Sequence, residues 1–240
     1  MPAGGTTARC VLKLSGEVLA GASGVGLDPA VLDDVAAQLA RAVEEGARVG
    51  VVLGGGNIFR GLGAAAAGMD RVAADEMGML ATVINGLALG DAIRRAGGRA
   101  ELFTARPLGP IGRPYVRDDA RGAIDGGACA VLAGGTGNPF FSTDSAAALR
   151  AAELGCGRLL KGTKVDGVYD ADPARDPDAK RFDALTFDEM IERRLGVMDL
   201  TAATLCRENG VEVLVYRMTD PGAIADAALG RVRGTRVTAG

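Results

Sequence analysis

The chain has 240 residues and a net charge of −3, so it can form one large α/β domain or two modest ones, and it lacks a basic block that would neutralise nucleic-acid phosphates. Glycine is abundant and aromatic residues are few, and histidine is absent, which excludes Ser-His-Asp and Cys-His catalysis and most zinc sites. The chemistry must therefore come from lysine, arginine, aspartate, backbone amides and, where one binds, a magnesium ion.

Four cysteines lie far apart without a CxxC pair, and we interpret Cys10, Cys129, Cys156 and Cys206 as reduced residues of the core. Residues 1–8 have neither the charged start nor the apolar centre of a signal peptide. No stretch approaches the roughly 20 apolar residues of a membrane span. These features predict a cytoplasmic protein that binds small molecules, without a membrane or nucleic-acid partner.

The first strand is predicted over residues 9–14, and Lys13 is its unexpected member. A buried lysine is costly unless it is paired, and most such residues lie at an edge or extend to solvent. At the carboxyl end of the strand, beside Ser15 and Gly16, this lysine can also reach an anion bound over the turn. A helix over 28–45 follows, with Asp28 as its N-cap.

The run 48–53 is apolar enough to be a strand buried on both faces, which indicates a parallel sheet covered by helices on both sides. Directly after it come Gly54, Gly55, Gly56 and then Arg60, at the end of a parallel strand where α/β sheets bind ligands. The glycines let a phosphate approach the backbone, and the arginine can donate to it. The plain alternative is a glycine-rich loop with a surface arginine. Neither GxGxxG nor GxxxxGK[ST] is present.

Further along, we expect a long helix over 69–96, with Gly78 and Gly86 as candidate breaks. Asp75 lies early in it, and a solvated carboxylate on the helix surface is its default interpretation. A third strand over 99–104, a loop over 107–114 and a short helix over 116–124 follow.

The central motif runs from Gly134 to Asp144, between a buried strand over 129–133 and a helix over 145–153. A glycine-rich turn that leads into a helix gathers backbone N–H groups around an anion. Phe140 and Phe141 suggest either a flat partner, such as a nucleobase, or a packing anchor. Asp144 can accept magnesium, orient Lys13 or only cap the helix.

The second half begins near residue 155 with a strand over 157–161, a hairpin-type turn at Asp166-Gly167 and an exposed loop over 170–180. We then expect two helices (185–194 and 199–209), a strand (210–216), a helix capped by Asp220 (221–229) and a last strand (235–238). Lysines and an arginine beside glycine turns suit phosphoryl transfer, which depends on positioning and on neutralising phosphate charge.

Five motifs now carry a resemblance, and they occur in order from about residue 9 to residue 237. They are Lys13-Leu-Ser-Gly-Glu17, Gly54-Gly-Gly-Asn-Ile-Phe-Arg-Gly61, Asp75-Glu-Met-Gly-Met-Leu-Ala-Thr82, Gly134-Gly-Thr-Gly-Asn-Pro-Phe-Phe-Ser-Thr-Asp144 and Lys164-Val-Asp-Gly-Val-Tyr-Asp-Ala-Asp-Pro173. The chain resembles the bacterial uridylate kinases of the amino acid kinase superfamily.

This resemblance implies a single domain over 1–240, a three-layer αβα sandwich with a mostly parallel sheet, with an acceptor lobe over about 1–155 and an ATP lobe over about 156–240. It also implies transfer of the γ-phosphoryl group from ATP to UMP in pyrimidine nucleotide biosynthesis. Mg²⁺ would be held through the ATP phosphates, with no residue assigned to it directly. The resemblance also implies that the chain associates with itself as a homohexamer and that GTP and UTP act as its effectors.

The resemblance further implies roles for individual residues. Lys13, Arg60 and Asp144 would serve catalysis, and Lys161 or Lys164 would supply a second cation, a choice that the sequence leaves open. The ATP-binding residues would be Lys13, Leu14, Ser15, Gly16, Gly56, Arg60, Thr163, Tyr169 and Asp172. The UMP-binding residues would be Gly55, Asp75, Thr136, Gly137, Asn138, Pro139, Phe140, Phe141, Ser142 and Thr143.

The chain departs from the family pattern at two places, and alternative functions therefore stay open. Where GTP-activated members tend to carry basic residues, this chain has Gly90 and Glu101, with Arg94, Arg95 and Arg99 nearby. The segment 106–112 is also unusually rich in glycine and proline. The alternatives are a phosphotransferase of the same superfamily with a shifted acceptor, and a nucleotide-binding regulator that has lost turnover.

Overall fold

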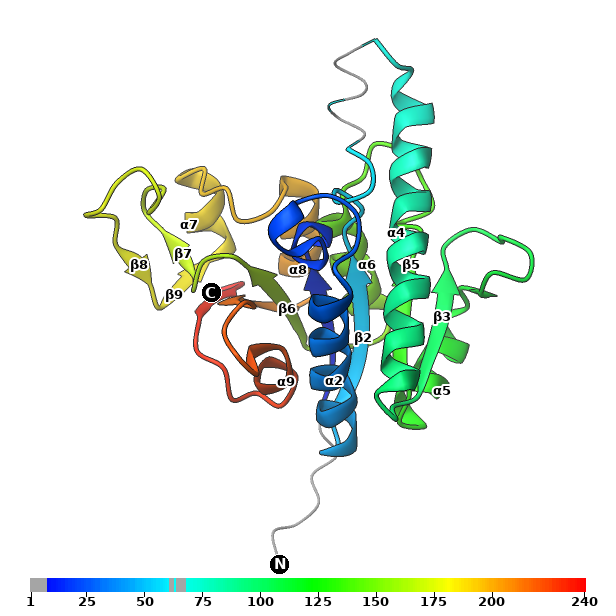
Figure 1. Ribbon diagram of the computed structural model, residues 1–240. Helices are drawn as coiled ribbons and strands as arrows, with labels where there is room; N and C mark the ends of the chain where they lie inside the picture. Colours follow the sequence, from blue (N-terminus) through cyan, green and yellow to red (C-terminus); the bar gives the residue numbers. More distant parts are fainter. Residues whose placement is uncertain (1–7, 61–62, 64–67) are drawn as a thin grey trace, which may run out of the picture.

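The structure is a computed structural model that describes residues 8–60, 63 and 68–240 (Figure 1). The expectations for residues 1–7 and for Gly61 lie outside the described residues. A nine-stranded sheet has the order β4-β3-β5-β2-β1-β6-β10-β11-β9 and is parallel except between β10 and β11. Its strands are β1 (Arg9–Leu14), β2 (Arg48–Leu53), β3 (Ala100–Thr104), β4 (Arg113–Pro114), β5 (Cys129–Ala133), β6 (Arg158–Thr163), β9 (Ala184–Thr186), β10 (Glu212–Arg217) and β11 (Thr235–Thr238). Because β1 pairs with β6, one sheet runs through both halves of the chain.

Helices cover both faces of this sheet, which confirms the predicted three-layer αβα arrangement (Figure 1). One face is covered by α2 (Pro29–Glu44), α4 (Arg71–Arg95) and α9 (Ala223–Ala228), and the other by α5 (Arg117–Asp125), α6 (Thr143–Glu153), α7 (Phe187–Glu192) and α8 (Leu200–Glu208). The short helix α1 (Gly16–Leu19) and the 3₁₀ turn η1 (Gly21–Ser23) follow β1. A small antiparallel pair, β7 (Val168–Tyr169) and β8 (Arg181–Phe182), projects from the second half of the chain.

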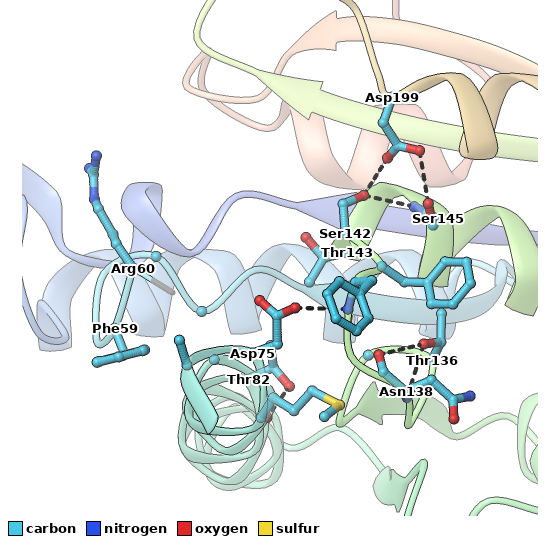
Figure 2. A pocket seen from close by; sticks show the side chains of 18 of the residues that line it. Phe59, Arg60, Asp75, Thr82, Thr136, Asn138, Ser142, Thr143, Ser145 and Asp199 are labelled. Atoms are coloured by element: carbon cyan, nitrogen blue, oxygen red, sulfur yellow. Dashed lines mark hydrogen bonds between the residues drawn. The ribbon is translucent and has the colours of Figure 1, made fainter. Parts of the chain in front are cut away.

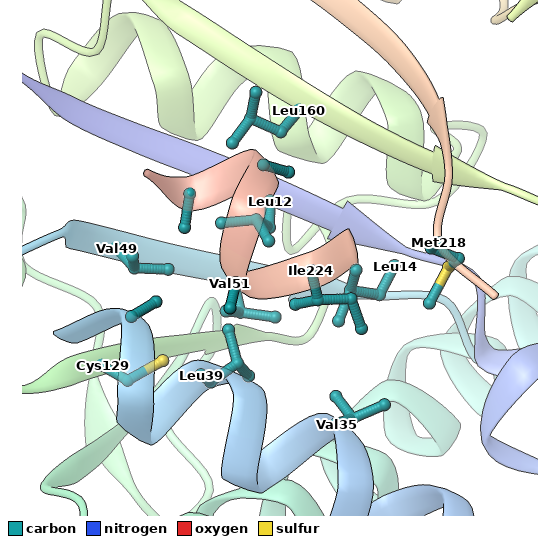
Figure 3. Packing of buried hydrophobic residues seen from close by; sticks show 14 of the residues in the cluster. Leu12, Leu14, Val35, Leu39, Val49, Val51, Cys129, Leu160, Met218 and Ile224 are labelled. Carbon is teal, nitrogen blue, oxygen red and sulfur yellow. The ribbon is translucent and has the colours of Figure 1, made fainter. Parts of the chain in front are cut away.

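Strand β1 shows why the two faces differ. Its side chains alternate, as a strand requires. Leu12 and Leu14 enter the core beneath α2 and α9, together with Val35, Leu39 and Ile224 (Figure 3). Residues Val11 and Lys13 point to the opposite face, where Val11 packs with α6. The lysine therefore lies on the side of the sheet on which α6 begins.

Helix α4 is continuous from Arg71 to Arg95, so the breaks expected at Gly78 and Gly86 were wrong. At Gly86 a Cβ would lie 2.9 Å from Leu102 Cδ1, and the glycine thus allows the helix to pack closely on β3. By length and composition alone α4 could cross a membrane, a test that core helices also pass. It contacts α2, β3 and β5, however, and forms part of the core.

Several other predicted helix and turn boundaries differ from those in the structure, for local reasons. Helix α6 begins two residues early because Ser142 accepts bonds from the Asp144 and Ser145 amides. The helix expected from residue 185 begins at Phe187, after strand β9, with a capping box between Thr186 and Glu189. Helix α9 follows Gly222 in a left-handed conformation instead of an Asp220 cap. The Asp166-Gly167 turn does not close a hairpin, because β6 and β7 belong to different sheets.

All four cysteines are buried and free, as predicted. Burial raises the pKa of Cys10, Cys129, Cys156 and Cys206 to about 12, so these thiols remain protonated at neutral pH.

Candidate active site

The centre of the site is a buried charge cluster at the carboxyl ends of two adjacent strands. Lys13 on β1 and Lys161 on β6 are Cα partners in the parallel register. Asp144 lies between them, with Oδ1 3.0 Å from Lys13 Nζ and Oδ2 2.5 Å from Lys161 Nζ. The three side chains are only 9–15% exposed. Two cations therefore share one carboxylate in a region from which water is largely excluded.

The titration of the cluster follows from this geometry. Burial alone would raise the pKa of Asp144, but the charges of Lys13 and Lys161 outweigh that effect and hold this pKa below its usual range. Burial lowers the pKa of Lys161, with the charge of Lys13 acting in the same direction and Asp144 opposing it. The carboxylate is thus ionised at neutral pH and neutralises the repulsion between the lysines.

The two lysines contact Asp144 differently. Lys161 donates a hydrogen bond to Oδ2. Lys13 forms an ion pair with Oδ1, at 3.0 Å from its Nζ. Because a lysine ammonium has three N–H donors, Lys13 Nζ keeps donors beyond this one contact.

Asp144 is positioned by the first turn of α6. The Ser142 hydroxyl caps that helix and itself donates a hydrogen bond to Asp199. Asp199 also accepts a bond of 2.9 Å from Ser145 Oγ and caps α8 through the Ala202 amide. The starts of α6 and α8 are therefore joined by the Asp199 carboxylate (Figure 2). Burial lowers the pKa of Lys161 in the cluster, and the charge of this carboxylate acts in the opposite direction with a smaller effect.

The glycine turns after β1 and β2 touch each other. The Gly54 amide donates to the Leu14 carbonyl at 2.9 Å, and a Cβ at Gly16 would collide with the Gly54 carbonyl oxygen. At Gly55, a Cβ would lie 2.8 Å from the Gly78 carbonyl oxygen on α4. Glycine at these positions therefore serves close packing of backbone on backbone, and the side chain of Leu14 is fully buried. Ser15 precedes α1 at its N-cap position.

Glu17, just after the first of these turns, forms ion pairs with two of the predicted cations. Arg60 Nη2 lies 2.6 Å from Glu17 Oε1, and Lys164 Nζ lies 3.6 Å from Oε2. Both cations are more than two-thirds exposed, at 67% and 69%. The structure thus places Lys161 in the buried cluster with Lys13 and Asp144, and Lys164 in an exposed pair outside it.

A cavity of about 680 Å³ lies in front of α4 and the 134–144 turn (Figure 2). Its lining includes most of the residues predicted to bind UMP: Gly55, Asp75, Thr136, Asn138, Phe140, Phe141, Ser142 and Thr143. Gly56 and Arg60, predicted to contact ATP, line the same cavity. Gly137 and Pro139 are not among its lining residues, and the Gly137 carbonyl instead accepts a bond from Arg106 Nε.

Within this cavity, Asp75 is tied to the turn. Its Oδ2 accepts hydrogen bonds from the Phe140 amide at 2.7 Å and from Arg71 Nε at 2.8 Å. The Arg71 guanidinium also lies 5.3 Å from the centroid of the Phe140 ring. Asp75 is therefore not the solvated surface carboxylate of the default interpretation, since its side chain is 14% exposed.

A second cavity, of about 480 Å³, is lined by Thr163, Tyr169 and Asp172. These are the residues predicted to border the ATP adenosine. Asp166 accepts a hydrogen bond from the Tyr169 hydroxyl at 2.7 Å and forms ion pairs with Arg181 and Arg217. The bond from Tyr169 and these arginines lower the pKa of Asp166. This carboxylate fixes the tyrosine at the rim of the cavity.

Backbone strain marks both cavities. Among the described residues, the non-glycine residues with positive φ are Phe140, at 70°, and Arg194, at 53°. Phe140 lines the first cavity and Arg194 the second. Such conformations cost free energy and concentrate at ligand sites.

Sequence reasoning missed three residues of this region. Arg71 stands four residues before Asp75, a helical ion-pair spacing that was available as a signal. Glu17 was quoted within a motif without a role, and its two cations come from distant segments. Asp199 is the first residue of a predicted helix and was recognisable as a cap, although its bonds to Ser142 and Ser145 were not.

Known proteins resemble this chain along nearly its whole length. The profile of the amino acid kinase family matches residues 8–217. A uridylate kinase of Alcanivorax borkumensis is 50% identical over 231 residues, which cover 96% of this chain and 92% of that protein.

Solved structures agree with this match. The crystal structure of UMP kinase from Ureaplasma parvum superposes with a TM-score of 0.91 and 37% identity, covering 97% of this chain and 99% of the other. That of UMP kinase from Bacillus anthracis also gives 0.91, with 33% identity and 96% of each chain covered.

Proposed function

This chain belongs to the amino acid kinase family, and we propose that it is a uridylate kinase, which transfers the γ-phosphoryl group of ATP to UMP and releases ADP and UDP. Uridylate kinases about half identical to it over nearly their full length support UMP as the acceptor. They favour this function over a shifted acceptor or an inactive regulator. The product would enter pyrimidine nucleotide biosynthesis in the cytoplasm.

One observation carries the proposal: residues that adjoin the charge cluster in the chain line both cavities. Asp144 directly follows Thr143, which lines the first cavity, and Lys161 stands two residues before Thr163, which lines the second. A phosphoryl group that passes from a nucleotide in one cavity to a nucleotide in the other would cross the two lysines. This supports binding of UMP in the first cavity and of ATP in the second.

The chemistry requires little of the protein beyond position and charge. The second pKa of a phosphate monoester is about 6, so the UMP phosphate is already an anionic nucleophile at neutral pH and needs no general base. Lys13 and Arg60 would neutralise the charge on the transferring group, and the backbone at Gly16 and Gly56 would approach the ATP phosphates. Because Lys161 is buried beside Asp144 whereas Lys164 is exposed, we assign Lys161 as the second cation.

Magnesium belongs to the same proposal. Both oxygens of Asp144 face lysines, and no group of three acidic, histidine or cysteine side chains converges among the described residues. A site with so few carboxylate oxygens suits an ion that arrives with ATP and is held mainly by the ATP phosphates, as Mg²⁺ commonly is. The bound ion would supply further charge neutralisation.

Self-association is supported by the outer face of α4. Met77, Leu80, Ile84 and Leu87 follow each other at spacings of three and four residues, and each is 43–51% exposed. A contiguous apolar stripe of this kind is typical of a helix that packs against a partner. We propose that α4 contacts a second copy of the chain within a homohexamer.

Control by GTP or UTP is a further part of the proposal. Near the end of α4, Arg95 pairs with Asp33 and Asp91, and Arg99 donates to the Gly126 carbonyl. An effector that binds these arginines would thus compete with bonds inside the chain.

A substrate panel tests the proposal. ADP release is measured with UMP, CMP, dTMP and AMP as acceptors, each with and without GTP or UTP. UMP should be strongly preferred, and activity should require Mg²⁺. Activity on none of these acceptors, or a clear preference for one other than UMP, would contradict the proposed function.

A further inference from the structure

Two asparagines beneath the glycine loop are unaccounted for by the proposed reaction. Asn57, in the loop after β2, is 2% exposed, and Asn85, in the middle of α4, is fully buried. Buried amides are costly unless their donors and acceptors are satisfied. Each donor and acceptor of these two side chains therefore needs a partner within the core.

The two side chains form a reciprocal pair. Asn57 Nδ2 donates to Asn85 Oδ1 at 3.0 Å, and Asn85 Nδ2 donates to Asn57 Oδ1 at 2.7 Å. The second proton of each amide is also used, by the Gly26 carbonyl for Asn57 and by the Gly54 carbonyl for Asn85, both at 2.7 Å. All four N–H groups of this amide pair are thus satisfied, so the arrangement specifies one geometry.

The amide pair joins three backbone segments. It connects the Gly54–Arg60 loop to α4 and to the segment after η1, where the Gly26 amide donates back to the Asn57 carbonyl at 2.8 Å. The Asn57 carbonyl-type oxygen Oδ1 also forms the wall against which Gly16 packs. The same pair is therefore in contact with both turns that are proposed to surround the ATP phosphates.

Helix α4 anchors the acceptor side through the same face. Thr82 Oγ1 accepts a hydrogen bond of 2.8 Å from the Gly134 amide, at the start of the acceptor turn, and donates to the Met79 carbonyl. Asp75, Thr82 and Asn85 follow each other at spacings of seven and three residues and so lie along one side of the helix, where Figure 2 shows the first two. Helix α4 thus contacts the Gly134–Asp144 turn through Thr82 and the Gly54–Arg60 loop through Asn85.

We propose that Asn57 and Asn85 are positioning residues for phosphoryl transfer. By locking the Gly54–Arg60 loop onto α4, they hold that loop at a set distance from the acceptor turn that Thr82 fixes on the same helix. The inference rests on the proposed function for its substrates, and on the bonds above for the device itself. A displacement of reacting groups by about 1 Å can cost about 100-fold in rate, so loss of the pair should act mainly on turnover.

A kinetic comparison of two buried polar residues tests this. Asn85→Ala should lower kcat by about 10- to 100-fold and leave KM for UMP within about twofold. Thr82→Val, a matched change on the same helix face, frees the acceptor turn and should raise KM for UMP more than it lowers kcat. Equal effects of both variants on both constants, or an unchanged kcat in Asn85→Ala, would overturn the proposal.

Amide hydrogen exchange provides a second measurement that needs no substrate. In Asn85→Ala, exchange at Gly54, Ile58 and Phe59 should accelerate at least about tenfold relative to the unsubstituted chain, while the amides of β5 stay protected. Asn85→Ser, which keeps a donor hydroxyl, is the variant to use if the alanine protein does not fold. Unchanged exchange in the loop refutes the positioning role. If the unsubstituted chain does not phosphorylate UMP, the proposed function fails, and exchange still decides whether the pair holds the loop.

Discussion

Replacing Asp144 by asparagine removes one negative charge from between two buried lysines at almost constant shape. At an effective dielectric constant of about 20, the attraction across 3.0 Å to Lys13 amounts to about 6 kcal/mol and that across 2.5 Å to Lys161 to about 7 kcal/mol. Desolvation of the three groups offsets most of this gain. Removing one partner of a buried ion pair typically costs about 3–5 kcal/mol, and we expect Asp144→Asn to lose about that much free energy of unfolding.

The loss should depend on pH in a defined direction. Because the pKa of Asp144 in the folded chain lies below its unfolded value of about 3.9, the carboxylate stabilises the fold fully above about pH 4 and loses this effect as the pH falls through the folded pKa. The difference between the two proteins should therefore shrink in acid. In the variant, a lysine whose folded pKa is lowered should make stability rise with pH up to about 10.

Urea unfolding followed by far-UV circular dichroism, at a fixed protein concentration, measures these differences. A second substitution sharpens the test, because Asp144→Asn with Lys161→Met removes one of the two repelling cations. This double variant should be more stable than Asp144→Asn alone. The charge-sharing account would be refuted if Asp144→Asn lost less than about 1 kcal/mol of free energy of unfolding. It would also be refuted if the double variant lost the sum of the losses measured for Asp144→Asn and Lys161→Met separately.

Four further predictions follow from the site. Lys13→Ala should lower kcat by about 100-fold or more in a coupled ADP assay, because the lost charge acts mainly in the transition state; a near-normal rate would remove this role. Asp75→Asn should raise KM for UMP more than it lowers kcat, and an unchanged UMP dependence would take Asp75 out of the acceptor site. Lys161→Met should cost far more turnover than Lys164→Ala, which we expect to lose less than about fivefold because exposed ion pairs are weak. Ile84→Lys should yield a smaller species in light scattering, whereas an unchanged mass would place the subunit contact elsewhere.

Much of this site was visible in the sequence because its signals are local. Apolar runs followed by glycines predicted strands β1 and β2 and the turns after them. A lone lysine in an otherwise apolar strand marked Lys13 as a residue that needs a partner, and Asp144 proved to be that partner. Glycine turns and strand ends depend on neighbouring residues only, so pattern and propensity suffice to find them.

The choice between Lys161 and Lys164 could not be made in the same way. It depends on β6 pairing with β1 in a register that sets Lys161 opposite Lys13, and such pairing is decided by the whole sheet. The same holds for Gly86, which looked like a helix break. Its lack of a side chain is needed by Leu102 on another strand, a relation that no local window contains.

The pairing of β1 with β6 also bears on the order in which the chain folds. These strands come from opposite halves of the sequence, and their register brings the ammonium groups of Lys13 and Lys161 together. Until the start of α6 delivers Asp144, mutual repulsion opposes closure of the central sheet. The pairing of β1 with β6 and the docking of α6 should therefore form as one cooperative step, so that a chain with a complete sheet already has its charge cluster assembled.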